Sequence, residues 1–77
     1  MNNIKAHHLK KLQAGIITAI EAGELQLKLI EMGFMDGQLI KLLHKSIGGK
    51  TLCFEVGNAY IGLRKKEAAL ISVLIQE

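Results

Sequence analysis

The sequence contains no proline, no tryptophan and a single cysteine, Cys53. One cysteine excludes an internal disulfide and a zinc site of the Cys-x-x-Cys type, and it favours a reducing compartment. Aromatic residues make up only 4% of the chain, so little is available to stack on nucleic-acid bases. The net charge of +3 is mild for so small a basic protein. We therefore expect neither a disulfide scaffold nor a nucleic-acid-binding protein.

Long apolar runs are also missing. A membrane-spanning helix needs about 18 or more consecutive apolar residues, and no segment approaches that length. The first residues, MNNIKAHH, lack the apolar stretch of a secretory signal. The 77 residues suffice for one small domain, and 49% hydrophobic content suffices for its core. We expect a cytoplasmic protein that does not span the membrane.

No recognisable arrangement of catalytic residues is present. Ser46 and Ser72 have no His or Asp partner at a familiar spacing. The segment Gly48-Gly49-Lys50 lacks the glycine-framed length of a phosphate-binding loop. We expect no enzymatic activity and no resident cofactor.

One segment has the periodicity of a helix, over residues 24–32. Leu25, Leu29 and Met32 recur at positions i, i+4 and i+7, which places them on one face. Gly33 follows directly and can adopt the left-handed conformation that ends a helix. So short a helix is stable only when packed against other elements.

The strongest local signal is a β-hairpin. Residues 51–56 and 59–63 flank Gly57-Asn58, a two-residue link typical of a type II′ turn. Counting outward from the turn pairs Val56 with Ala59, Phe54 with Ile61, and Leu52 with Leu63. These six apolar residues lie on one face of the hairpin, so we expect that face to be core.

The remaining pattern completes a mostly β fold. Residues 16–20, 38–44 and 70–75 are interpreted as strands, and residues 64–69 as a helical turn. The fold class is a small SH3-like barrel of about five antiparallel strands with one short α-helix (24–32) and a helical turn (64–69). We expect residues 1–8 to be a flexible N-terminal arm and residues 9–77 to form the domain.

Adjacent histidines, His7 and His8, are the one weak candidate for a metal site. Imidazole is a ligand for iron, zinc and related ions. Adjacent side chains on an extended segment point apart, however, and no carboxylate lies nearby in sequence. We interpret the pair as part of a solvated arm and assign no metal ligands.

Two segments together resemble the FeoA family, small cytosolic proteins of bacterial ferrous iron uptake. Residues 27–37, LKLIEMGFMDG, are similar to the family's "RL-x-x-(L/M)-G-(aromatic or apolar)-x-x-G" segment. Residues 56–68, VGNAYIGLRKKEA, are similar to its "G-(N)-x-x-(I/L)-x-L-R-x-x-E/D-A" segment. The resemblance spans residues 9–75. Departures include Lys28 in place of the usual arginine and Met35-Asp36 where proline is common before the second glycine.

The resemblance implies a non-enzymatic accessory or regulatory protein whose partner is FeoB, the membrane permease with a cytosolic GTP-binding part. Such a protein is recruited to the inner face of the cell membrane when its partner is bound there. The alternative is a stand-alone SH3-like regulatory domain related to the C-terminal domain of metal-dependent repressors, which senses metal or binds nucleic acid.

Two surfaces are candidates for partner binding. One is the basic turn Arg64-Lys65-Lys66, and the other is the helix with its exit, where Leu27, Phe34 and Met35 exceed the needs of one buried stripe. We expect four further residues to serve as structural turns: Gly33, Gly37, Gly57 and Asn58.

Overall fold

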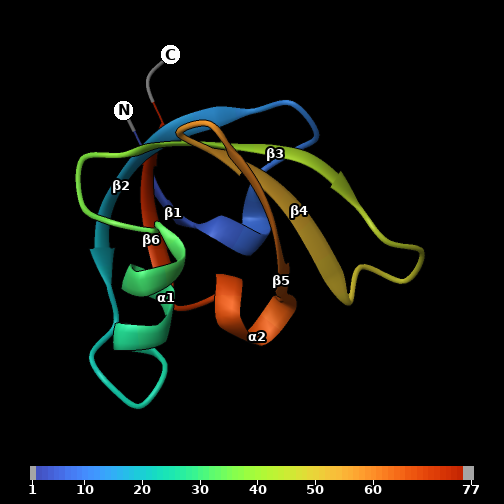
Figure 1. Cartoon of the computed structure of the whole chain (residues 1–77). Helices are drawn as coiled ribbons and strands as arrows, with labels where there is room; N and C mark the ends of the chain where they lie inside the picture. Colours follow the sequence, from blue (N-terminus) through green and yellow to red (C-terminus); the bar gives the residue numbers. More distant parts are fainter. Residues whose placement is uncertain (1, 76–77) are drawn as a thin grey trace.

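Six antiparallel strands curl into one sheet in the computed structural model, which describes residues 2–75. Figure 1 shows the strands wrapping around a central core. In chain order the elements are β1 (Asn2–Lys5), the 3-10 helix η1 (Ala6–His8), β2 (Ala14–Ile20), α1 (Gln26–Met32), β3 (Leu39–Lys45), β4 (Thr51–Val56), β5 (Ala59–Arg64), α2 (Lys65–Ala68) and β6 (Ile71–Ile75). The order in the sheet is β1-β6-β2-β3-β4-β5. The predicted mostly β fold with one short helix and a helical turn is confirmed.

The hairpin of β4 and β5 has the predicted register. Val56 pairs with Ala59, Phe54 with Ile61, and Leu52 with Leu63. Gly57 has φ of 59°, as the first central residue of a type II′ turn requires. One detail differs, because Ala59 is exposed beside the turn and does not join the core.

Two phenylalanine rings meet at the centre of the core. Phe34 and Phe54 are fully buried, with ring centroids 6.2 Å apart in an edge-to-face arrangement. Ile40 and Leu42 of β3 are fully buried as well, whereas Leu39 remains 57% exposed. The predicted alternation in this strand is therefore correct, and its inward face is the one that carries Ile40 and Leu42.

The helix α1 begins at Gln26, two residues later than predicted. It ends as predicted at Gly33, which has φ of 114°. The N–H of Phe34 donates to the carbonyl oxygen of Leu29, and the N–H of Gly33 to that of Ile30, both at 3.0 Å. This is the hydrogen-bond pattern of a Schellman motif, whose accompanying apolar contact is between the residues at the positions of Leu29 and Phe34. Both side chains are fully buried.

The N-terminal segment corrects the sequence analysis. Residues 2–5 are not a flexible arm but form β1, which pairs with β6 from Asn2 opposite Ile75 to Lys5 opposite Ser72. Residues 6–8 form η1, whose Ala6 is fully buried. The physical reason is that β1 covers an edge of β6 that would otherwise present unpaired backbone groups. Met1, the first residue of the expected arm, lies outside the described residues, as do residues 76–77 of the expected domain.

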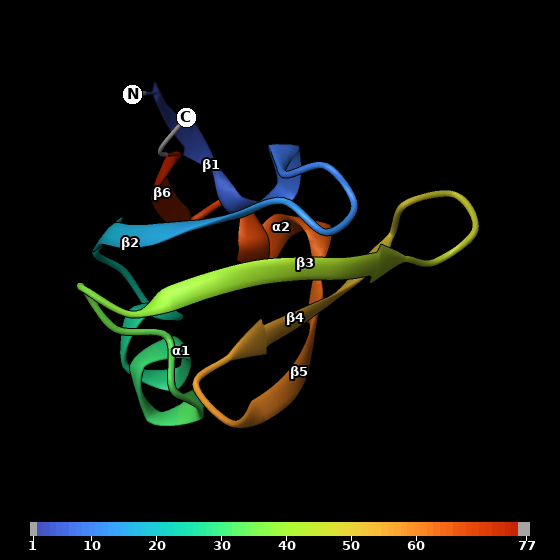
Figure 2. The same ribbon diagram turned by 90° about the horizontal axis from the view of Figure 1, so that it is seen from above.

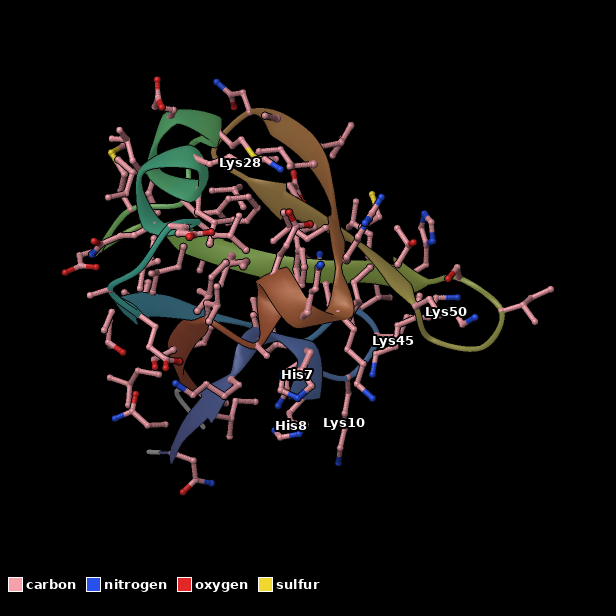
Figure 3. The ribbon with its side chains drawn as sticks, turned by 90° about the horizontal axis from the view of Figure 1, so that it is seen from below. His7, His8, Lys10, Lys28, Lys45 and Lys50 are labelled. Atoms are coloured by element: carbon pink, nitrogen blue, oxygen red, sulfur yellow. The ribbon has the colours of Figure 1, made fainter. Side chains whose placement is uncertain are left out.

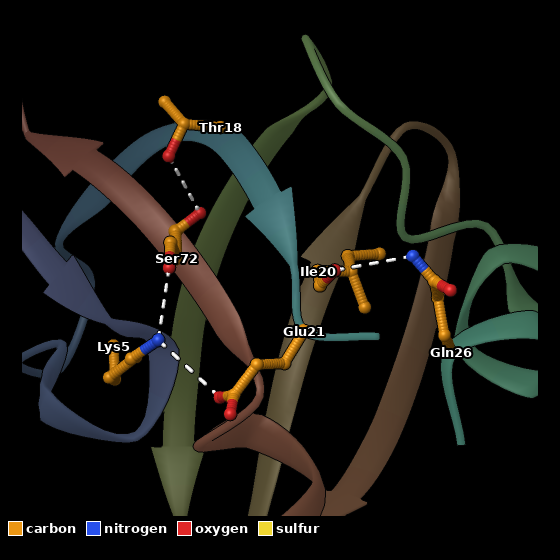
Figure 4. A network of polar contacts seen from close by, with 6 residues as sticks. All are labelled: Lys5, Thr18, Ile20, Glu21, Gln26 and Ser72. Atoms are coloured by element: carbon orange, nitrogen blue, oxygen red, sulfur yellow. Dashed lines mark hydrogen bonds and ion pairs between the residues drawn. The ribbon is translucent and has the colours of Figure 1, made fainter. Parts of the chain in front are cut away.

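Polar side chains fasten β1 to its neighbours, as Figure 4 shows. The Nζ of Lys5 donates to the hydroxyl of Ser72 at 3.2 Å and lies 3.7 Å from a carboxylate oxygen of Glu21. The hydroxyl of Thr18 contacts the Ser72 carbonyl oxygen at 3.3 Å. The same region ties α1 to β2, since the amide of Gln26 donates to the carbonyl oxygen of Ile20 at 3.3 Å. These contacts hold residues from both ends of the chain on one side of the barrel.

Both helices lie at the same side of the sheet, where Figure 2 shows α1 next to the turn between β4 and β5, and α2 at the far end of β5. Neither helix, nor any other among residues 2–75, has the length and apolar character needed to cross a lipid bilayer.

Candidate partner-binding site

Three apolar side chains on α1 and its exit face solvent. Leu27 is 65% exposed, Met35 45% and Ile30 37%. Leu27 and Ile30 are three residues apart on a helix and therefore lie on the same face. Leu27 and Met35 are therefore exposed, as a partner-binding role for this region requires.

Phe34 does not belong to this surface. It was expected to contact a partner, but its side chain is fully buried against Phe54. The left-handed turn at Gly33 directs the chain inward, so that Phe34 completes the core beneath α1.

A buried carboxylate joins α1 to α2. Glu67 accepts a hydrogen bond from the backbone N–H of Arg64 at 2.9 Å, and its second carboxylate oxygen lies 3.3 Å from the Nζ of Lys28. The Glu67 side chain is only 11% exposed. The hydrogen bond from Arg64 is the main cause that lowers the pKa of the Glu67 carboxyl, and Lys28 adds to it, while burial opposes the change. Glu67 is therefore ionised at neutral pH and fixes both helices to one another.

An open cleft of about 490 Å³ lies where the two helices approach the end of β5. Lys28 of α1 and Leu25, the residue before α1, line it on one side, and Arg64, Lys66 and Glu67 line it on the other. The cleft joins the basic turn to Lys28 of α1, and the exposed Leu27 precedes Lys28 on that helix. Ile30 and Met35 line a separate cleft together with Ile20 and Asp36. We treat the exposed side of α1 and the cleft beside α2 together as one candidate surface. We call this surface the α1–α2 face and define it by Leu27, Lys28, Ile30, Met35, Arg64 and Lys66.

The basic turn borders three clefts. Arg64 and Lys66 line the cleft beside α1, and together with Lys65 they also line a second cleft that contains Lys50. Of the three residues, Lys65 alone lines a third cleft, with His7 and Lys45, and it does not reach the cleft beside α1. All three residues of the turn are exposed. Lys65 is accordingly left out of the α1–α2 face.

His7 and His8 are not on a solvated arm. Their rings lie against each other in η1 with centroids 3.9 Å apart, because a helical turn brings together side chains that an extended segment would separate. Burial lowers the pKa of His7 most, and the positive charges of His8, Lys65, Lys45 and Lys5 lower it further. The positive charges of the surrounding lysines repel a metal cation from this pair. Among residues 2–75, no group of three or more His, Cys, Asp or Glu side chains could hold a metal ion.

Sequence reasoning missed the role of Glu67. The glutamate three residues after a helix N-cap is half of a capping box, but that signature is recognised when serine or threonine occupies the cap. Here Arg64 occupies it and contributes its backbone N–H. Lys28 and Glu67 are 39 residues apart in the sequence, so no local sequence pattern predicts the contact between them.

The chain matches one family model, described as the FeoA domain, over residues 5–74. A search of curated proteins finds no match.

Three solved structures are similar to the chain. Iron(II) transport protein A from Clostridium thermocellum is 36% identical, with a TM-score of 0.88 over 94% of this chain and 45% of that one. FeoA from Stenotrophomonas maltophilia, solved with zinc, is 23% identical, with a TM-score of 0.79 over 91% of this chain and 88% of that one, and is described as a prokaryotic SH3 domain protein and a suggested activating factor of ferrous iron transport. A manganese-dependent transcriptional repressor shares the fold at 13% identity, with a TM-score of 0.86 over 96% of this chain and 42% of that one.

Proposed function

The chain belongs to the FeoA domain family, and from this premise we propose that it is a non-enzymatic accessory protein of bacterial ferrous iron uptake that binds the FeoB permease. The single observation that supports this most is the α1–α2 face, where the helix that exposes Leu27 also carries Lys28, which lines a cleft with Arg64 and Lys66. In this proposal the protein lies in the cytoplasm and is brought to the inner face of the membrane by its partner.

The composition of the α1–α2 face suits a protein partner. Protein interfaces have an apolar centre and a polar rim, and a few central side chains carry most of the binding energy. Leu27, Ile30 and Met35 supply apolar surface, and a flexible methionine adapts to the shape of a partner. Arg64 and Lys66 lie at the edge of this surface, where charges mainly speed association and orient the partner.

Leu27→Ser is expected to weaken binding to the permease by about 10-fold or more, since central interface residues cost about 1–2 kcal/mol or more when truncated. The substituted side chain is already exposed, so the free energy of unfolding should change by no more than about 0.5 kcal/mol. Lys66→Glu should also weaken binding and reduce its dependence on salt. Calorimetric titration against the GTP-binding domain and, separately, against the full-length permease in detergent measures both effects.

The matched control is Tyr60→Ser, which truncates a side chain that is 73% exposed on β5, outside the α1–α2 face. Equal loss of affinity with Tyr60→Ser and Leu27→Ser would mean that the wrong face has been assigned. Absence of binding to either form of the permease at tens of micromolar would contradict the accessory role.

A second function, a stand-alone regulatory domain, is favoured by one observation, the likeness of the fold to a metal-dependent repressor. A gel-shift assay distinguishes the two. Binding of DNA that weakens steeply with salt would support the regulatory domain, whereas permease binding without DNA binding supports the accessory protein.

A further inference from the structure

The end of the barrel away from α1 carries two adjoining clefts lined by cations. Gly48, Gly49 and Lys65 line both of them. The first, of about 500 Å³, is also lined by Lys50, Arg64 and Lys66, and the second, of about 230 Å³, by Lys45. None of the carboxylates within residues 2–75 lines either cleft. We call this surface the basic end and define it by His7, His8, Lys45, Lys50 and Lys65.

The basic end gathers side chains from three separate parts of the chain. Figure 3 shows His7, His8 and Lys10 beside Lys45 and Lys50, with Lys28 on the other side of the molecule. The Nζ of Lys45 lies 3.4 Å from the carbonyl oxygen of His7, and the N–H of Lys65 donates to the carbonyl oxygen of Lys50 at 3.0 Å. The positive groups are thus held together by the fold and attract an anionic surface jointly.

An apolar side chain stands at the outermost point of this end. Ile47 is 103% exposed, the largest exposure among the large apolar side chains of residues 2–75. It lies in the loop between β3 and β4, which projects beyond the barrel in Figures 1 and 2. Lys45 and Lys50 flank it in the sequence.

The loop that carries Ile47 has a closed base. The N–H of Ser46 donates to the carbonyl oxygen of Thr51 at 2.8 Å, and the N–H of Thr51 donates to the hydroxyl of Ser46 at 3.0 Å. The N–H of Gly49 donates to the carbonyl oxygen of Ser46 at 2.8 Å. These hydrogen bonds fix the conformation of the loop. The apolar side chain of Ile47 therefore projects from a loop whose two ends carry Lys45 and Lys50.

Negative charge is concentrated at the opposite end. Glu24, Glu31 and Asp36 lie on α1 or in the segments that flank it, and all three are exposed. Figures 1 and 2 place α1 and the projecting loop at opposite sides of the molecule. A negatively charged plane therefore attracts one end of the protein and repels the other, which fixes its orientation.

We propose that the basic end docks on an anionic lipid bilayer, with Ile47 inserted among the headgroups and Lys45, Lys50 and Lys65 in contact with lipid phosphates. Lysine has a long stem and a point charge that adapts to mobile headgroups, and an apolar side chain beside it can enter the interface. A protein partner would instead call for an extended apolar or aromatic centre, whereas the basic end offers one exposed apolar side chain, Ile47. The proposal does not depend on FeoB, because the lipid itself is the ligand.

In this orientation the apolar part of the α1–α2 face stays clear of the lipid plane. α1 lies on the side of the barrel opposite the projecting loop, and Leu27 belongs to α1. Arg64 and Lys66 line the first cleft of the basic end as well, so they lie between the two surfaces. Docking on lipid through one end and binding a second protein through the other can then occur together.

Flotation with vesicles tests the docking without any other protein. The full chain should bind vesicles of phosphatidylcholine mixed with phosphatidylglycerol, should not bind phosphatidylcholine alone, and should dissociate as salt rises. Each lysine near an anionic surface strengthens binding about fivefold, so Lys50→Gln/Lys65→Gln should weaken it by about 25-fold. Lys28→Gln/Lys41→Gln removes the same charge from residues that line neither cleft of the basic end and should have at most a few-fold effect.

Insertion of the loop has its own readout, because the chain contains no tryptophan. Ile47→Trp should bind anionic vesicles at least as well as the original protein. The fluorescence emission of its tryptophan should shift to shorter wavelength on binding. Ile47→Ser, at a fully exposed position, should leave the melting temperature unchanged and weaken vesicle binding by about 10-fold.

Three results would overturn the proposal. One is failure to bind anionic vesicles at low salt, and another is equal loss with the two double lysine variants. The third is binding of soluble polyglutamate as tight as that of vesicles with no emission shift at position 47, which would reassign the basic end to an acidic protein partner. Loss of permease binding with intact vesicle binding would refute the proposed function and leave this inference standing.

Discussion

Phe54→Ala is expected to lower the free energy of unfolding by about 3–5 kcal/mol, the usual cost of truncating a buried phenylalanine. Phe54 is fully buried at the centre of β4, with Ile61 opposite it on β5 and Leu42 opposite it on β3. Its ring also meets that of Phe34 edge to face at 6.2 Å, and such aromatic pairs add about 0.5–1.5 kcal/mol. A domain of this size has a total stability at the low end of about 5–15 kcal/mol. The variant should therefore be partly or wholly unfolded.

Circular dichroism during heating and urea titration measures this effect. Tyr60→Ala is the control, since that aromatic side chain is 73% exposed and its truncation should cost no more than about 0.5 kcal/mol. A cooperative transition of Phe54→Ala that shifts by only a few degrees would place Phe54 at the periphery of the core. Phe34→Leu/Phe54→Leu, compared with each single change, isolates the coupling between the two rings.

The parts of the fold that the sequence predicts are those with a local cause. Gly57-Asn58 sets a tight turn, and the turn fixes the whole register of β4 and β5 because side chains alternate along both strands. Gly33 ends α1 because a glycine accepts the left-handed conformation there. Each inference requires only neighbouring residues, so a single sequence suffices.

The parts that the sequence does not reveal depend on distant partners. β1 has little apolar alternation, with Asn2 and Asn3 exposed, and exists because β6 pairs with it. Phe34 follows directly after the helix, and its burial depends on Phe54 twenty residues later. In each case the residue type alone is compatible with surface and interior, and the tertiary contact decides.

The same distinction separates the two candidate surfaces. The composition of residues 64–66 predicts a basic surface, and Leu27 and Met35 predict an apolar one, but only the folded chain shows that Lys28 of α1 lines one cleft with Arg64 and Lys66. It also shows that all three residues of the turn line a cleft with Lys50, and that Lys65 alone of the three reaches the cleft with His7. Hydrophobic periodicity places a residue on a face of its own element and does not tell which other elements share that face.

Glu67→Ala is expected to lower the free energy of unfolding by about 2 kcal/mol. The change leaves the N–H of Arg64 without its acceptor and Lys28 without its counter-ion, and a hydrogen bond to a charged group contributes about 1.5–3 kcal/mol. Glu67→Gln should cost less, because its amide oxygen can still accept the bond from Arg64. For a domain of this size the shift in melting temperature is about 4–8 °C per kcal/mol.

The pH dependence of the free energy of unfolding separates the contribution of the negative charge of Glu67 from that of its size and hydrogen bonding. In the folded protein the pKa of the Glu67 carboxyl is lowered below its ordinary value of 4.5, chiefly by the Arg64 hydrogen bond. The unfolded chain therefore binds the proton more readily, so this contribution to stability is present above pH 4.5 and is lost as the pH falls through the lower folded pKa. The difference in unfolding free energy between the original protein and Glu67→Gln should be largest near pH 7 and shrink under acid, as measured by urea titration at a series of pH values. Glu24→Gln, at an exposed position, is the control and should differ by no more than about 0.5 kcal/mol at any pH. A Glu67→Gln difference that stays constant between pH 7 and pH 3 would show that shape and hydrogen bonding alone join α1 to α2, with no contribution from the charge.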